Sequence, residues 1–254
     1  MMYKKAEAKK WHTPGGTAPQ LYLDILQQPH TLIAGSTGSG KSVLINGLIY
    51  TALYKAPSQL QLVLIDPKRV ELCQYKTLPH CLRYASEPEE IAATLTWAVN
   101  LMDAIYRDMQ SRGIKEWDGE HIYIIIDEFA DLMTLQKRET LPKIQRLAQL
   151  GRAAHIHLIA ATQRPTRDVV NGAIKVNMDA RIALRCPTAQ DSRNIIDVKG
   201  AETLPRYGFG YYITPEYTTP QLVKIPYTAP SDLADRVKWW DAQKEKTRRR
   251  WWQR

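Results

Sequence analysis

The sequence predicts an α/β fold in which a mostly parallel sheet carries helices on both faces. Five short segments rich in Ile, Leu, Val or Ala have the length and residue types of strands covered on both faces. Between them lie segments whose apolar residues recur every three or four positions, as in helices with one buried face. Alternating strands and helices of this kind typically build one parallel sheet, because each crossover helix packs on a face of that sheet.

The expected elements follow in order along the chain. Strands are expected at residues 31–34, 60–65, 122–126, 157–161 and 180–184, with a short further strand at 211–213 in a segment broken by glycine and proline. Helices are expected at 41–54, at roughly 137–150 before Gly151, and near 231–242. A further, long helix is expected to begin at a capping box at 86–89 and to end near Gly113. We divide the chain into a basic N-terminal tail (1–14), one folded domain (15–230) and a C-terminal helix with a basic Trp- and Arg-rich tail (231–254).

Composition excludes several classes of protein. A membrane-spanning helix needs about 20 consecutive apolar residues, whereas the longest apolar run, 122–126, has the length of one strand. The basic start of the chain is not followed by the apolar stretch of a secretory signal. Cys73, Cys81 and Cys186 form no CxxC pair, which indicates a reducing compartment and no cysteine-based metal site. We therefore expect a cytoplasmic protein without a membrane span.

Most of the net charge of +9 lies at the two ends of the chain. Residues 1–12 hold four lysines against one glutamate, and residues 244–254 hold six basic residues against one glutamate. The body is close to neutral, so any contact with nucleic acid there must come from a few placed residues. Trp239-Trp240 and Trp251-Trp252 stand among these basic residues. They could bind nucleic acid, lie on a membrane or partner, or pack the closing helix on the body.

The strongest motif is a phosphate-binding loop. The pattern G-x-x-x-x-G-K-[ST] is matched by Gly35, Ser36, Thr37, Gly38, Ser39, Gly40, Lys41 and Ser42. The motif follows an expected strand and opens an expected helix, which is the setting of a P-loop. Small residues let backbone N–H groups surround the phosphates, and the start of the helix favours anions. Lys41 would supply charge at the β- and γ-phosphates, and Ser42 a ligand to Mg²⁺.

Two further pairs of polar residues follow expected strands. Asp127 and Glu128 end the strand 122–126, where acids must face something polar or cationic. We expect Asp127 to hold Mg²⁺ and Glu128 to orient water for attack on the γ-phosphate; the alternative is that one of them caps the next helix. Thr162 and Gln163 follow the strand 157–161 and are the candidate γ-phosphate sensors, with Gln163 also a catalytic candidate. The alternative for this pair is a solvated loop.

Several segments, in order, resemble the motor domain of FtsK/SpoIIIE DNA translocases. They are residues 30–42, 65–72, 127–132, 151–158, 161–165 and 191–193, and the resemblance covers roughly 15–215. It implies a RecA-like ATPase that uses ATP and Mg²⁺, assembles as a hexameric ring and moves double-stranded DNA through its pore. Arg152 falls at the family's arginine finger, which reaches the γ-phosphate of the neighbouring subunit, and Arg164 and Arg193 match its DNA-facing loops. Without the family, Arg152 reads as a helix-dipole partner and the other two as solvated charges.

The chain also departs from that family's pattern. Residues 188–190 lack a Lys that the family often has there, His155 replaces a Gly, and 204–210 differs from the usual Leu-Gly-x-Gly-Asp-Met. We expect no membrane domain before the motor and no winged-helix module after it. His80, His121, His155 and His157 lack metal-ligand spacing, so we expect them to be ordinary structural residues.

The sequence thus predicts a RecA-like P-loop ATPase that translocates double-stranded DNA as a hexamer. One alternative is a coupling or packaging ATPase of a mobile element or phage. A second is a nucleotide-gated clamp that holds DNA without net movement. Glu128 argues against the clamp, because a gate without turnover has no need of a base for water. The compact size suggests a bacterial phage or mobile-element protein.

Overall fold

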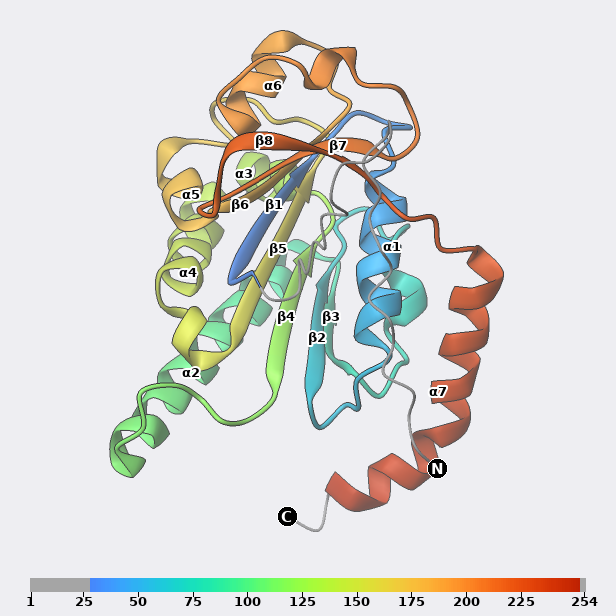
Figure 1. Ribbon diagram of the computed structural model, residues 1–254. Coiled ribbons are helices and arrows are strands. Elements are labelled where there is room, and N and C mark those ends of the chain that lie inside the picture. Colours follow the sequence, from blue (N-terminus) through green and yellow to red (C-terminus); the bar gives the residue numbers. More distant parts are fainter. Residues whose placement is uncertain (1–27, 252–254) are drawn as a thin grey trace.

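An eight-stranded sheet forms the centre of the structure (Figure 1). The computed structural model describes residues 28–251, without the side chains at 135, 218 and 244–251. The strands are β1 (His30–Ala34), β2 (Leu60–Ile65), β3 (Cys81–Ala85), β4 (His121–Ile126), β5 (Ile156–Thr162), β6 (Ala180–Leu184), β7 (Phe209–Thr214) and β8 (Tyr217–Lys224). Their order is β3-β2-β4-β5-β1-β6-β7-β8. All neighbours from β3 to β6 pair in parallel, and β7 and β8 add an antiparallel hairpin at one edge. The expected mostly parallel sheet is confirmed.

Helices cover both faces of this sheet. They are α1 (Lys41–Ala52), α2 (Pro88–Arg112), α3 (Phe129–Leu135), α4 (Lys137–Leu150), α5 (Gly172–Asn177), α6 (Ala189–Ile196) and α7 (Pro230–Trp251), with 3₁₀ turns η2 (Cys73–Tyr75), η3 (Arg152–Ala154) and η4 (Ala201–Thr203). Apolar residues of α1 and α7 form one buried cluster with the sheet, and residues of α2 to α6 form the other. The expectation of helices on both faces is therefore confirmed.

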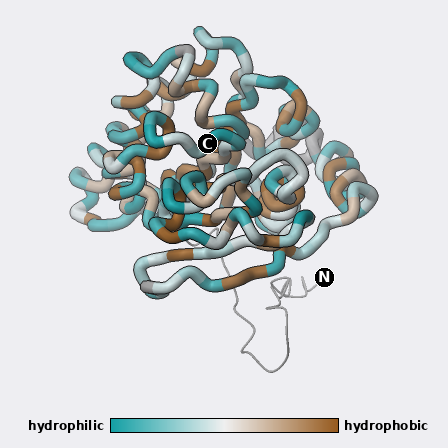
Figure 2. The backbone as a smooth tube through the Cα atoms, turned by 90° about the horizontal axis from the view of Figure 1, so that it is seen from above, coloured by the Kyte–Doolittle hydropathy of each residue, from teal (hydrophilic) through white to brown (hydrophobic). Residues whose placement is uncertain are grey.

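The central strands are apolar throughout because both of their faces are covered. In β4, Ile124 and Ile126 belong to the cluster under α2 to α6, while Ile125 belongs to the cluster under α1 and α7. Alternate side chains of a strand point to opposite faces, so one run of isoleucines fills both cores. In the view from above, hydrophobic and hydrophilic residues alternate along the outer helices, as expected for helices with one buried face (Figure 2).

Five elements were not expected from the sequence. These are β3, β8, α3, α5 and α6. Strand β3 is half exposed and carries Arg83, so it lacks the continuous apolar run of a central strand. Strand β8 contains Pro220, which an edge strand tolerates because one row of its backbone groups needs no partner. The three helices are too short to show a clear helical period.

Several expected boundaries need correction. Helix α1 ends at Ala52, two residues before the expected end at Tyr54. The box at the start of α2 is shifted by one residue: Glu90 Oε2 accepts hydrogen bonds from the backbone N of Ser86 at 3.1 Å and of Glu87 at 3.2 Å. Strand β7 is longer than the expected 211–213, because pairing with β6 and β8 extends it.

The closing helix α7 also runs further than expected, since its backbone stays helical beyond residue 242. Trp240 is 7% exposed and packs edge-on against His80, whereas Trp239 is 37% exposed. Of the uses foreseen for this Trp pair, packing of the helix on the body is the one that Trp240 serves. The tail 1–14 and Trp252 lie outside the described residues. Within residues 28–251, no helix combines the length and apolarity that crossing a membrane requires.

Candidate nucleotide-phosphate site

Residues 35–40 form the loop between β1 and α1, and Lys41 and Ser42 open α1, as predicted. Gly40 has a φ of 102°, and a Cβ on it would lie 2.9 Å from the backbone N of Gly208. A Cβ on Gly35 would lie 2.6 Å from Leu184 Cβ. Glycine is therefore required at both positions, because any side chain would meet backbone or a core residue. The loop's tight path depends on these two glycines.

The three predicted parts of the site meet at the carboxyl ends of the parallel strands, which we call the carboxyl edge of the sheet. Strands β1, β5 and β4 are adjacent and parallel, so their carboxyl ends lie side by side. The loop follows β1, Thr162-Gln163 comes at the end of β5, and Asp127-Glu128 follows β4. Ligands of open α/β sheets bind at this edge. The separate sequence signals thus become one site, with the amino end of α1 facing it.

Lys41 and Asp127 form a buried ion pair across this edge. Lys41 Nζ lies 2.6 Å from Asp127 Oδ1 and donates to the Asp127 carbonyl oxygen at 2.8 Å. The side chains are 4% and 2% exposed. Burial raises the pKa of Asp127, and the ammonium of Lys41 opposes that rise. The pair fixes the lysine ammonium next to the carboxylate that is predicted to serve Mg²⁺.

Oxygen ligands of the kind that Mg²⁺ prefers gather at the same place. Ser42 Oγ donates to Glu71 Oε1 at 2.5 Å. The Asp66 carboxylate is fully buried; its Oδ2 accepts from Leu72 N at 2.9 Å, while Oδ1 has no hydrogen-bond partner among the described residues. An orphaned buried carboxylate oxygen fits the vicinity of a cation. The described residues hold no ready-made cluster of metal-binding side chains, so Ser42 and Asp127 would need phosphate and water to complete a Mg²⁺ shell.

Glu128 is held by four hydrogen bonds and is 0% exposed. Its Oε1 accepts from Thr162 Oγ1 at 2.6 Å and from Gln163 N at 3.1 Å, and its Oε2 from Lys68 Nζ at 2.9 Å. A weaker bond of 3.3 Å joins Gln163 N to Oε2. Burial favours the neutral acid, but the bonds from Thr162, Lys68 and Gln163 outweigh it and lower the pKa of Glu128. Glu128 precedes α3 without capping it through its side chain. It is an ionised, oriented carboxylate.

The sensor candidates connect the loop to this acid. Thr37 Oγ1 donates to Gln163 Oε1 at 3.0 Å, and Thr162 Oγ1 donates to Glu128. Gly35 N donates to the carbonyl oxygen of Thr162 at 3.2 Å. The end of β5 is therefore bonded on one side to the phosphate loop and on the other to Glu128. Its polar residues are part of the site and not a solvated loop.

Three residues of the site have no role in the sequence interpretation: Asp66, Lys68 and Glu71. All three lie in the connection after β2, which reaches Ser42 and Glu128. Asp66 carries the same signal as Asp127, an acid directly after an apolar strand, and could have been found from it. The contacts of Lys68 and Glu71 depend on how the connection folds, and no spacing in the sequence indicates them.

The sequence matches the FtsK/SpoIIIE family over residues 12–124 and 119–167, which is more than half of the chain. The chain belongs to the FtsK/SpoIIIE family. The segment matched holds the phosphate loop, the acids after β4 and the end of β5. The predicted family resemblance is confirmed.

Two relatives agree with this family, and a solved structure has a similar fold. The chain is 46% identical over 193 residues to the DNA translocase FtsK of Caldanaerobacter subterraneus, covering 71% of this chain and 27% of that one. It is 40% identical over 233 residues to the FtsK of Treponema pallidum, covering 85% of this chain and 29% of the relative. It thus spans less than a third of these relatives. In fold it is similar to the pCW3 conjugation coupling protein TcpA, at 23% identity, with a TM-score of 0.77 over 91% of this chain and 69% of TcpA.

Two arginines that match DNA-facing positions of the FtsK/SpoIIIE family lie near the carboxyl edge. Arg164 follows the sensor residues, is exposed, and forms an ion pair with Asp131 of α3. Arg193 is exposed on α6. The two segments are tied together, because Asn194 Nδ2 donates to the carbonyl oxygen of Pro165 at 2.8 Å. Neither arginine contacts the phosphate loop in any hydrogen bond or ion pair of the described residues.

Arg152, at the position of the family's arginine finger, lies away from the phosphate loop. It opens η3 and is exposed, at the amino end of β5 and therefore at the opposite edge of the sheet. His155 ends this turn with a φ of 52°, and its ring stacks on that of His121 at 4.1 Å between centroids. His121 Nδ1 in turn lies 2.9 Å from His157 Nε2. The histidines stack against one another in the structure and brace the turn.

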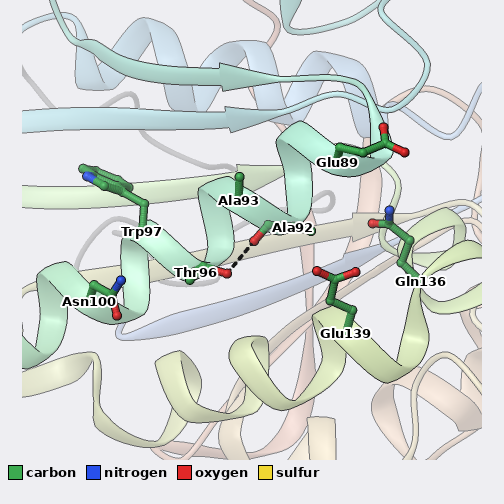
Figure 3. Close-up of a pocket in the computed structure, with 8 residues that line it drawn as sticks. All are labelled: Glu89, Ala92, Ala93, Thr96, Trp97, Asn100, Gln136 and Glu139. Atoms are coloured by element: carbon green, nitrogen blue, oxygen red, sulfur yellow. Dashed lines mark hydrogen bonds between the residues drawn. The ribbon is translucent and has the colours of Figure 1, made fainter.

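A surface groove lies apart from all of these residues. Figure 3 shows it between α2 and the start of α4, with a volume of about 530 Å³. It is lined by Glu89, Ala92, Ala93, Thr96, Trp97, Asn100, Gln136 and Glu139. None of the phosphate-site residues borders it, so it is not part of the candidate site.

Proposed function

We propose that this chain hydrolyses ATP at the carboxyl edge of its sheet. The observation that carries the proposal is the ionised Glu128, fixed beside the Lys41–Asp127 pair and bonded to the residues next to the phosphate loop. A carboxylate at this place can orient a water molecule for in-line attack on a γ-phosphate. Gln163 joins this carboxylate to the loop, because its backbone N donates to Glu128 and its Oε1 accepts from Thr37.

Lys41 would supply the positive charge that the phosphates need. Its ammonium would leave Asp127 and pair with the phosphates when the nucleotide binds. Ser42 and Asp127 would hold Mg²⁺, which supplies charge neutralisation at the β- and γ-phosphates when it is bound. Electrostatic stabilisation of this kind accounts for most of the catalysis in phosphoryl transfer. The chemistry thus requires Lys41 and Glu128 in different roles, one for charge and one for the water.

The work done by this hydrolysis is proposed to be movement of double-stranded DNA. The proposal is supported by the FtsK relatives, which are DNA translocases, and by the position of Arg164. Arg164 N donates to Thr162 Oγ1, and Thr162 Oγ1 donates to Glu128. A DNA contact at Arg164 is therefore connected to Glu128 by two successive hydrogen bonds. Arg193 would contact the same DNA through α6. We place this ATPase in the cytoplasm of a bacterium, encoded by the bacterium itself or by a phage or mobile element.

A ring of subunits, by family a hexamer, is part of the proposal. A single chain leaves its phosphate site without an arginine finger, because Arg152 lies at the far edge of its own sheet. A neighbour in a ring can supply that arginine. The folded motor would extend over 15–230, with the tails 1–14 and 231–254 outside it.

The direct test is ATP turnover of the purified chain with and without double-stranded DNA, with Mg²⁺ present. We expect DNA to stimulate turnover and the Lys41→Ala variant to lose it by roughly hundredfold or more. Lys76→Ala, an exposed lysine outside the site, is the matched control. Turnover of Lys41→Ala within a few-fold of the starting protein would falsify the nucleotide assignment.

A second measurement separates a motor from a clamp. A motor displaces a protein roadblock bound to the DNA in an ATP-dependent way, and Glu128→Gln abolishes the displacement. A nucleotide-gated clamp binds DNA with ATP but leaves the roadblock in place. A coupling or packaging ATPase displaces it as a motor does, so this rival differs in its biological setting and not in this assay.

A further inference from the structure

Glu128 is out of reach of water in this arrangement, although its proposed role is to orient one. The side chain is 0% exposed, so no water can touch its carboxylate. Of its partners, Thr162 is fully buried and Gln163 contributes a backbone N–H. Lys68 alone among them is a long side chain that reaches solvent, with 41% of it exposed. For a water molecule to reach Glu128, Lys68 is the group that can leave.

Lys68 sits on a short connection whose two ends are joined by a hydrogen bond and whose middle residues are exposed. Asp66 Oδ2 accepts from Leu72 N and closes the connection, and both residues are fully buried. Between them, Arg69 has a φ of 58°, a left-handed conformation that is unfavourable for a residue other than glycine, and Val70 is exposed. A strained, exposed segment between fixed ends can change conformation without disturbing the sheet.

A second ion pair lies beside the first. Arg164 pairs with Asp131, which is three residues after Glu128 on the first turn of α3. Pro67 and Arg69, the two neighbours of Lys68, line a cavity of about 100 Å³ together with Asp131. Arg69, the other cation of this connection, pairs with Glu87, whereas Lys68 is the one that pairs with Glu128.

We propose that Lys68 is a positioning residue that covers Glu128 until DNA draws Arg164 away from Asp131, whereupon Lys68 exchanges Glu128 for Asp131. The proposal rests on the proposed function, in which Arg164 contacts DNA and Glu128 orients water. A phosphate competes well with a carboxylate for an arginine. The partly buried Asp131 is then left without its cation, which costs free energy, and a lysine whose two neighbours line the same small cavity as Asp131 can remove that cost. Glu128 keeps its bonds from Thr162 and Gln163 and gains access to water.

Three variants test this exchange by the ATP turnover with and without DNA. Lys68→Ala uncovers Glu128, so turnover without DNA should rise about threefold to tenfold and DNA should stimulate it little further. Asp131→Asn removes the second partner of Lys68, so DNA stimulation should be lost while turnover without DNA stays unchanged. The combined variant should behave as Lys68→Ala does, because Asp131 matters in this exchange only as the second partner of the Lys68 side chain.

DNA affinity gives a readout that does not depend on hydrolysis. Asp131→Asn frees Arg164, so binding to double-stranded DNA should tighten about twofold to fivefold, the range expected for loss of one exposed ion pair. Lys68→Arg should keep the starting behaviour, since it retains the cation. Lys76→Ala and Asp168→Asn, exposed residues outside both pairs, are the matched controls, and thermal unfolding checks that each variant folds.

Distinct outcomes would overturn the exchange. Full DNA stimulation in Asp131→Asn shows that Asp131 is not the second partner. A hundredfold loss of turnover in Lys68→Ala, with no gain without DNA, shows that Lys68 is a cation needed for the chemistry and not a cover. If the starting protein itself lacks DNA-stimulated turnover, the proposed function fails instead, before any variant is compared.

Discussion

Arg152 and Lys41 lie at opposite ends of two neighbouring strands of one sheet. Arg152 precedes β5 and Lys41 follows β1, and these strands pair in parallel with Ala34 opposite Thr162. Seven residues of β5 separate the two edges, about 23 Å at 3.3 Å per residue, which is far longer than an arginine side chain. Arg152 therefore has no access to the phosphate loop of its own chain.

This separation predicts complementation between two inactive variants. Arg152→Ala and Glu128→Gln should each lose turnover, with a loss of about 10³–10⁵ expected where an arginine finger is removed. In mixed rings, some interfaces combine an intact Glu128 with an intact Arg152 from the neighbour, so activity should return in part. The measurement is ATP turnover across mixing ratios, with subunit exchange verified by native mass. If mixed rings form and no ratio exceeds the two parents, Arg152 does not act between subunits.

The second prediction concerns how α7 is held on the body. Trp240 Nε1 donates to the carbonyl oxygen of Leu53, the residue that follows α1, at 2.8 Å, and Arg236 Nε donates to the same oxygen at 3.1 Å. Trp240→Ala removes a buried aromatic ring and one of these bonds, so the free energy of unfolding should fall by about 3–5 kcal/mol. Chemical denaturation measures it. Trp239→Ala, at the exposed neighbouring position, is the control and should change stability by less than about 1 kcal/mol.

The sequence alone predicts which residues lie at strand ends, but not which segments pair through tertiary contacts. The phosphate loop, Asp127-Glu128 and Thr162-Gln163 could be placed because each follows an apolar strand, and parallel neighbours bring strand ends together. Strand β3 and the contacts of Lys68 could not, because they depend on tertiary pairing and not on a local period. The place of Arg152, at the opposite ends of the strands, follows from the same rule for strand ends, because Arg152 precedes an expected strand whereas the phosphate loop follows one.

The third prediction is a loss of stability at mildly acidic pH. Burial, and then the charge of His157, lowers the pKa of His30 to about 3, and burial, and then His121, lowers the pKa of His157 to about 4. In the unfolded chain both rings titrate near the ordinary value of about 6.5. Between pH 6.5 and 4 the unfolded state therefore binds more protons, and stability falls as the pH falls. At pH 5 each ring lowers the free energy of unfolding by about 2 kcal/mol relative to pH 7.

Denaturation at pH 7 and pH 5 checks this prediction. His157→Gln removes one titrating ring, so its stability should fall less between the two pH values than that of the starting protein, by about 2 kcal/mol. Lys76→Ala should show the same pH dependence as the starting protein. Equal stability at pH 5 and pH 7 in the starting protein would show that these rings take up protons as readily in the fold as in the unfolded chain.

The last prediction separates the basic tail from the body in DNA binding. Residues 244–254 hold six basic residues against one glutamate, whereas the body is close to neutral. Each phosphate neutralised contributes about −0.9 to the slope of log K against log salt. If the tail lies on DNA, deleting 244–254 should flatten that slope by several units, while ATP turnover at saturating DNA should survive, because no motif of the phosphate site is removed.

Arg164→Ala combined with Arg193→Ala should do the opposite: it should uncouple turnover from DNA and keep most of the salt-sensitive binding. An unchanged salt slope after the deletion would assign the tail to solvent or to a protein partner, because charges that neutralise no phosphate release no counterions.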